Sequence, residues 1–161
     1  MNRKRLGIYL NDHLAGATVG RELASRSLGS NRGTAYGGFL EDLLEDIEKD
    51  RQALEDLMER LGIGKDPVKV VFAWAGEKVG RLKMNGQLRG YSPLSRLEEL
   101  EGLALGVWGK LALWEALREL ADRDPILREV DLERLIQRAE SQVAGLQEQR
   151  RLAALEALDE G

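Results

Sequence analysis

The chain lacks cysteine and carries a single histidine among its 161 residues. The absence of cysteine excludes disulfides, thiolate metal sites and cysteine nucleophiles. With His13 alone, histidine-rich zinc sites and most acid–base arrangements cannot be built, and no Ser-His-Asp or Cys-His arrangement is recognisable. We therefore expect a non-enzymatic protein without a resident cofactor, with metal binding by oxygen ligands left open.

The chain also lacks a long uncharged apolar run and a strong excess of one charge. Its net charge of −4 excludes general binding of nucleic acid or anionic membranes through bulk charge. No signal peptide or membrane-spanning segment is visible, so we expect a cytoplasmic protein. Residues 1–161 suffice for one domain with a sizeable core.

Apolar residues recur at steps of three and four along four long segments, which cover residues 3–28, 34–61, 92–122 and 131–158. This spacing is typical of amphipathic helices that bury one stripe. Ser92 before Pro93 is the expected N-cap of the third helix, with Ser95 and Glu98 as a capping box one turn later. Thr34 and Asp131 are the expected N-caps of the second and fourth helices.

Short breaks at residues 29–33 and at Asp124-Pro125 join the four segments in pairs, which predicts two antiparallel helical hairpins. Between the pairs, residues 67–84 are interpreted as a shorter fifth helix that carries the chain back along the bundle. A strand over residues 68–74 is the alternative, because apolar residues alternate there. The pattern predicts an all-α four-helix bundle, two hairpins joined by a long crossover.

This order of elements resembles the ferritin-like four-helix bundle over nearly the whole chain. The runs YLNDHLAG and LEELEGLALGVWGKLALW are similar to uncharacterised bacterial proteins of that superfamily. The di-iron site of ferritin-like proteins needs a Glu on each of two helices and Glu-x-x-His on the other two. No Glu-x-x-His occurs in this sequence. The resemblance therefore implies the fold without the oxidase, ferroxidase or iron-storage activity.

One polar layer is expected inside the first hairpin. His13 falls on the apolar stripe of the first helix, and antiparallel pairing places it beside residues 50–52. We predict a buried layer of His13, Asp50 and Arg51, in which Asp50 pairs with His13 and raises the pKa of the imidazole. A structural role in fixing the helix register is favoured, with ligand binding or proton transfer as the alternative.

A second polar contact is expected between Lys110 and Glu140 at the edge of the buried stripe. The functional alternative is a divergent metal-binding or redox protein that uses buried carboxylates with His13. Oxygen ligands of that kind suit Mg, Ca or Mn. The carboxylates of this alternative set are Glu22, Asp50, Glu101 and Glu140.

The middle of the first helix is unusually small, with Gly16 and Gly20 among alanines. We predict that Trp108 of the third helix lies opposite Gly16 and fills this hollow. The crossover carries a candidate partner surface made by Trp74, Lys78 and Arg81. Together these features favour a bundle that acts through protein–protein or homo-oligomeric contacts.

Overall fold

The computed structural model describes residues 1–66 and 90–159, which form four long helices and two short ones. The described residues contain no strand, which confirms the all-α prediction for this part of the chain. None of the described helices has the length and apolarity needed to cross a membrane. The helices are α1 (Arg3–Asn31), α2 (Gly37–Arg60), α4 (Pro93–Arg118), η1 (Ala121–Arg123), α5 (Pro125–Arg128) and α6 (Leu132–Leu158).

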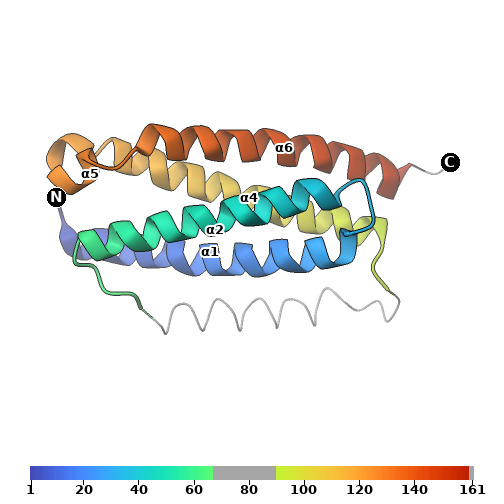
Figure 1. The fold of residues 1–161 in the computed structure, drawn as a ribbon, viewed down its shortest axis with the longest axis horizontal. Coiled ribbons are helices and arrows are strands. Elements are labelled where there is room, and N and C mark those ends of the chain that lie inside the picture. The colour runs from blue at the N-terminus through green and yellow to red at the C-terminus, as the bar shows by residue number, and fades with distance from the viewer. Residues whose placement is uncertain (67–89, 160–161) are drawn as a thin grey trace.

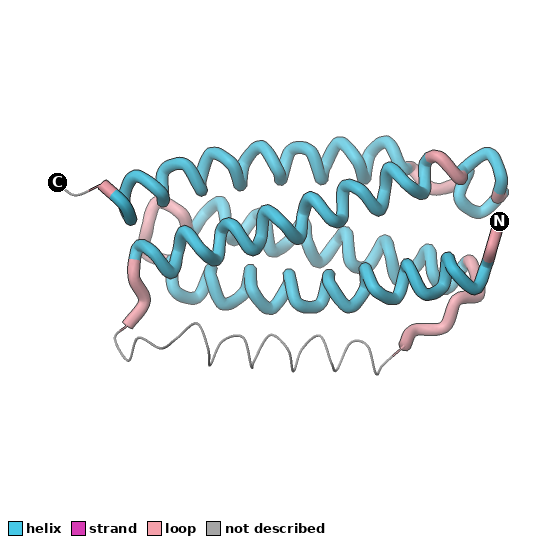
Figure 2. Tube along the Cα trace, turned by 180° about the vertical axis from the view of Figure 1, so that it is seen from behind, coloured by secondary structure: helices cyan, strands magenta, loops and turns pink. Residues whose placement is uncertain are grey.

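The four long helices run side by side as two antiparallel pairs, α1 with α2 and α4 with α6 (Figure 1). Helix α4 also packs antiparallel against α1, and α2 meets α6 over a smaller area. The view from behind shows the same order of helices (Figure 2). The two predicted hairpins are therefore confirmed.

Side-chain contacts fix where the chain leaves the first pair and enters the second. At the N-terminal end of α1, the backbone N–H of Asp66 donates to Asn11 Oδ1 at 2.7 Å. At the other end of α1, Asn31 Nδ2 donates to the Tyr91 hydroxyl at 2.6 Å. The last described residue before the gap and the first ones after it thus lie at opposite ends of the bundle (Figure 1). The predicted crossover helix, its strand alternative and the candidate partner surface of Trp74, Lys78 and Arg81 lie outside the described residues.

The expected starts of α4 and α6 and the end of α2 are confirmed, whereas α1 continues to Asn31, past the expected break at residue 29, and α4 ends at Arg118, short of residue 122. Ser92 caps α4 by accepting from the backbone N–H of Ser95 at 3.1 Å, and Asp131 caps α6 by accepting from Arg134. Helix α2 ends before Gly62, whose φ of 67° suits glycine. Because Ser92 holds the first turn of α4, the capping box starting at Ser95 is wrong.

Thr34 is wrong as the N-cap of α2. Its hydroxyl donates to the carbonyl of Asn31 and accepts from the backbone N–H of Tyr36, so it closes the turn that follows α1. Helix α2 starts later, at Gly37. A Cβ at Gly37 would lie 2.9 Å from the Asn31 carbonyl oxygen, so only glycine allows this close corner.

The apolar core is divided into two clusters along the bundle axis. One cluster lies at the N-terminal end of α1 and includes Leu10, Met58 and Trp114. The other lies towards the far end and includes Leu40 and Leu146. Along α2, α4 and α6 the two clusters meet at the same level, where polar residues interrupt each apolar stripe.

Candidate ligand-binding cavity

Asp50 of α2 is the centre of the polar layer between the two apolar clusters. Its side chain is only 2% exposed. Oδ1 accepts from Arg138 Nε at 2.7 Å, and Oδ2 accepts from Gln142 Nε2 at 3.2 Å and from Lys110 Nζ. A buried carboxylate is stable only when its oxygens are paired in this way. Asp50 therefore ties α2 to α4 and α6.

Lys110 of α4 donates to Asp50 Oδ2 and to Gln142 Oε1. Burial lowers the pKa of Lys110, and the carboxylate of Asp50 only partly opposes that effect. An ammonium group has three N–H donors, and two of these have partners among the described residues. The third remains available to another acceptor.

A cavity of about 220 Å³ lies beside this layer, between α1, α2 and α4. Its α1 wall combines Asp12 and His13 with the small residues Gly16, Ala17 and Gly20. Because Gly16 and Gly106 are exposed, the cavity reaches the surface. Apolar side chains form much of the remaining wall. They are Ile47, Leu54, Leu103, Val107, Leu113 and Trp114, and Lys110 joins them.

Two buried N–H donors, each on a residue of the cavity lining, have no hydrogen-bond partner in the described part of the chain. They are the indole Nε1 of Trp114, whose side chain is 1% exposed, and Nε of Arg51. A buried donor without an acceptor costs about 1–3 kcal/mol. Because both donor atoms are closed to solvent, a molecule in the cavity does not reach them unless the side chains shift.

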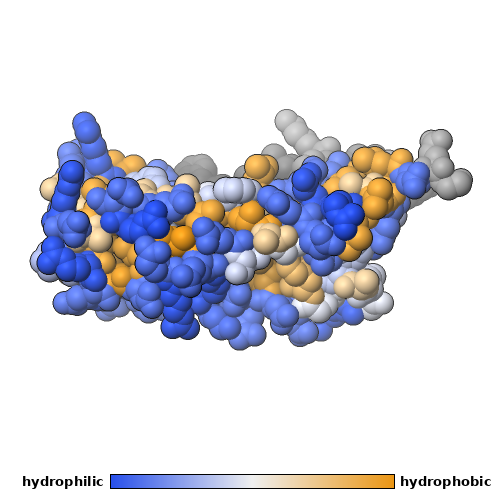
Figure 3. All heavy atoms as spheres, turned by 90° about the horizontal axis from the view of Figure 1, so that it is seen from above, coloured by the Kyte–Doolittle hydropathy of each residue, from blue (hydrophilic) through white to orange (hydrophobic). Residues whose placement is uncertain are grey.

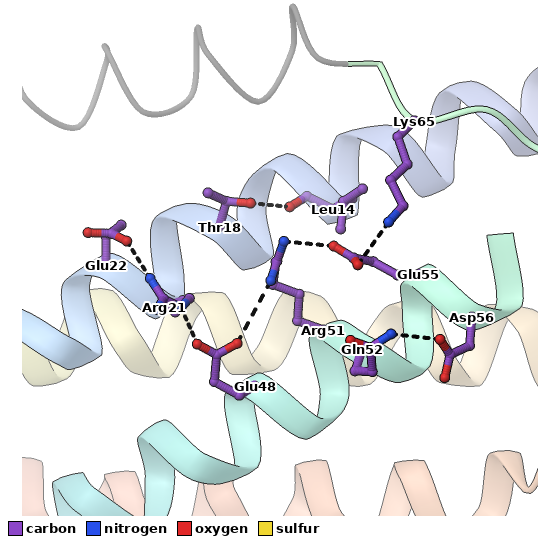
Figure 4. Close-up of polar contacts among 10 residues, drawn as sticks. All are labelled: Leu14, Thr18, Arg21, Glu22, Glu48, Arg51, Gln52, Glu55, Asp56 and Lys65. Carbon is purple, nitrogen blue, oxygen red and sulfur yellow. Dashed lines mark hydrogen bonds and ion pairs between the residues drawn. The ribbon is translucent and has the colours of Figure 1, made fainter. Parts of the chain in front are cut away.

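A chain of alternating charges across α1 and α2 holds Arg51 in place (Figure 4). Its guanidinium pairs through Nη2 with Glu55 at 2.7 Å and through Nη1 with Glu48 at 3.8 Å. Glu48 also binds Arg21 of α1, and Glu55 binds Lys65. Carboxylates thus hold both Nη atoms of the guanidinium, whereas Nε has no hydrogen-bond partner among the described residues.

The structure corrects the predicted polar layer of His13, Asp50 and Arg51. All three residues line the same cavity, but Asp50 bonds to α4 and α6 and His13 packs edge-on against Tyr9 with ring centroids 4.6 Å apart. The predicted rise in the pKa of His13 is wrong. Its pKa is lowered, because burial outweighs the nearby charge of Asp12.

The predicted pair of Lys110 with Glu140 is also wrong, since Lys110 bonds to Asp50 and Gln142 and Glu140 is exposed. The alternative carboxylate set is not assembled either. Of its members, Glu101 is exposed and pairs with Arg150, whereas Glu22 pairs with Arg21. Within residues 1–66 and 90–159, no three His, Cys, Asp or Glu side chains are placed to hold one metal ion.

Trp108 does not fill the hollow opposite Gly16. Its side chain is 50% exposed on the outer face of α4, and a Cβ at Gly16 would meet no described atom within 4 Å. The hollow is therefore part of the cavity. The buried tryptophan of α4 is Trp114, almost two turns further on.

Sequence reasoning missed Arg138 and Gln142 as partners of Asp50. A signal was present, because Gln142 interrupts the stripe formed by Ala139, Val143 and Leu146 of α6. A polar residue in each of two facing stripes indicates a shared layer. Recognising the layer also required knowing which residues of α2 and α6 lie at the same height along the bundle.

Comparisons of the chain with protein-family models, with curated proteins and with solved structures found no match.

The lowered pKa of His13 predicts a loss of stability in acid. The unfolded chain, with a histidine pKa of 6.5, binds the proton more readily than the folded protein does. The free energy of unfolding should therefore fall from about pH 7.5 to about pH 5.5, and His13→Gln should reduce that fall. Urea unfolding of both proteins at the two pH values measures this. Equal losses in the wild type and the variant would contradict the prediction.

Proposed function

We propose that this chain is a ferritin-like four-helix bundle that acts as a non-enzymatic binding protein and takes a small molecule into the cavity beside Lys110. The ferritin-like part is supported by the order of the elements, a hairpin followed by a second hairpin that begins at the opposite end of the bundle. Ligand sites of helix bundles commonly lie between the helices, at the level where polar side chains enter the core.

The observation that carries the binding role is the cavity itself, which reaches the surface and places the ammonium group of Lys110 beside apolar walls. The surrounding apolar walls are typical of small-molecule sites, in which a few polar groups orient the ligand.

A binding role is favoured over catalysis by the state of Lys110. Its amino group is held between Asp50 and Gln142, and these two contacts restrain it from moving to attack a bound molecule. His13 packs against Tyr9 and its lowered pKa keeps it neutral near pH 7. These two groups therefore serve binding and orientation in this proposal.

Filling the cavity tests the proposed function. Gly16→Leu places a side chain where no described atom lies within 4 Å of the added Cβ, so the variant should fold and occupy part of the cavity. A small-fragment screen by ligand-detected NMR should yield compounds that bind the wild type, with affinity lost by at least about tenfold in Gly16→Leu.

The matched control is Gly29→Leu, which makes the same substitution in α1 at an exposed glycine outside the cavity lining. This control should bind the fragments as the wild type does. Fragments that bind all three proteins equally, or a screen without any binding compound, would refute the cavity as a functional site.

A second candidate function is self-association through the outer face of α4. Leu105 is 75% exposed and Trp108 is 50% exposed, and the two lie one helical turn apart. Figure 3, which looks onto the α6 side, shows further apolar patches among charged side chains. Exposed apolar pairs of this kind favour contact with a second copy of the chain.

Light scattering of the wild type should then give the mass of a dimer, and Trp108→Lys should give that of a monomer. Ile8→Lys is the control, because Ile8 is equally exposed on α1. A wild-type protein that stays monomeric at high concentration would exclude this candidate.

A further inference from the structure

We infer that the cavity beside Lys110 is a site for a compact, uncharged apolar molecule about the size of one aromatic ring. This inference rests on the proposed binding function and gives the chemical class of the ligand. Three features support it: the size of the cavity, the apolar surface of its walls and the pairing of the charges around it.

The size of the cavity limits the ligand to about one ring. A cavity of about 150 Å³ lined by apolar side chains takes benzene. The cavity of this bundle, about 220 Å³, therefore has room for one ring with a short substituent. Because Gly16 and Gly106 on its wall are exposed, such a molecule enters from solvent without the unfolding of a helix.

The surface that the cavity offers to a ligand is mostly apolar. Helices α2 and α4 contribute aliphatic side chains, which are those of Ile47, Leu54, Leu103, Val107 and Leu113. Between them, the backbone of α1 and α4 is bare at four glycines, which are Gly16, Gly20, Gly106 and Gly109. A ligand without charged groups gains free energy by removing this surface and its own from water.

The two cations of the cavity wall already have anionic partners. Arg51 lies between Glu48 at 3.8 Å and Glu55 at 2.7 Å. Lys110 forms an ion pair with the buried carboxylate of Asp50. Neither cation therefore lacks an opposite charge that an anionic ligand would have to supply.

Further charges near the wall oppose a ligand of either sign. Burial lowers the pKa of Lys110, and the charges of Asp50 and Asp46 oppose that effect, so both carboxylates lie near the ammonium group. Asp12 adds a carboxylate at the exposed rim. An anion would thus meet carboxylates as well as cations, and a cation would meet Lys110 and Arg51. Either ion loses hydration without gaining an unpaired opposite charge, which favours an uncharged ligand.

Three probes that share one benzene ring separate charge from shape. Toluene is uncharged, benzoate is an anion, and benzylamine is a cation near pH 7. Titrations are followed by the methyl signals in NMR spectra, because the ring of a bound probe shifts the signals of nearby methyl groups. Toluene should shift those of Leu54, Leu103 and Val107, and leave that of Leu28, which lies outside the cavity lining. We expect toluene to bind at least about tenfold more tightly than either ion.

Two further measurements locate the site and test the absence of charge recognition. Gly16→Leu should lose toluene binding, whereas the control Gly29→Leu should bind toluene as the wild type does. Raising the salt concentration from about 0.05 M to about 0.5 M should not weaken toluene binding, since an uncharged ligand has no charge to screen.

The outcomes distinguish this inference from the proposed function. If either ion binds as tightly as toluene and binding is lost in Gly16→Leu, the uncharged class is overturned and the cavity remains a binding site. The same holds if toluene fails while other fragments bind the wild type and lose affinity in Gly16→Leu. Toluene binding that persists in Gly16→Leu would place the probe elsewhere and overturn the inference. Failure of every fragment would overturn the proposed function together with the inference.

Discussion

The rest of this bundle depends on the pairing of one buried carboxylate. Asp50 would be unstable in the apolar interior without partners, and it obtains them from Lys110, Arg138 and Gln142 on the two helices of the other hairpin. These contacts fix the level of α2 against α4 and α6, because a shift of one helix along another would separate them. They also explain why the core consists of two apolar clusters with a polar layer between them.

The same layer positions the candidate site. Lys110 stands at the boundary between the polar layer and the cavity, where it is held by Asp50 and Gln142. Glycines of both helices line the cavity at this level, Gly16 and Gly20 on α1 and Gly106 and Gly109 on α4, and their missing side chains leave the space open. Trp114 is buried and forms part of the cavity wall. The proposed binding role therefore rests on an open cavity beside a fixed polar layer.

The fold was more predictable than the site. The four helices, their pairing and the caps at Ser92 and Asp131 follow from local periodicity and short loops, which one sequence contains. The partners of Asp50 and the position of Trp108 depend on how each helix is rotated about its own axis and shifted along the bundle relative to helices of the other hairpin. Local sequence patterns do not specify either quantity. His13 shows the difference. Its place on α1 was predicted, but the bonding of Asp50 to α4 and α6 was not. The predicted direction of the pKa shift of His13 was therefore wrong. The crossover residues lie outside the described part of the chain, and their predicted helix stays a prediction.

The central claim is that Asp50 and Lys110 act as one buried unit, and a double-mutant cycle tests it most directly. The free energies of unfolding of the wild type, Asp50→Ala, Lys110→Met and the double variant are measured in urea. We expect a coupling energy of about 1–3 kcal/mol between the two positions, because each residue loses its partner in the single variants. Effects that add to within about 0.3–0.5 kcal/mol would show that the two side chains do not depend on each other and would contradict the claim.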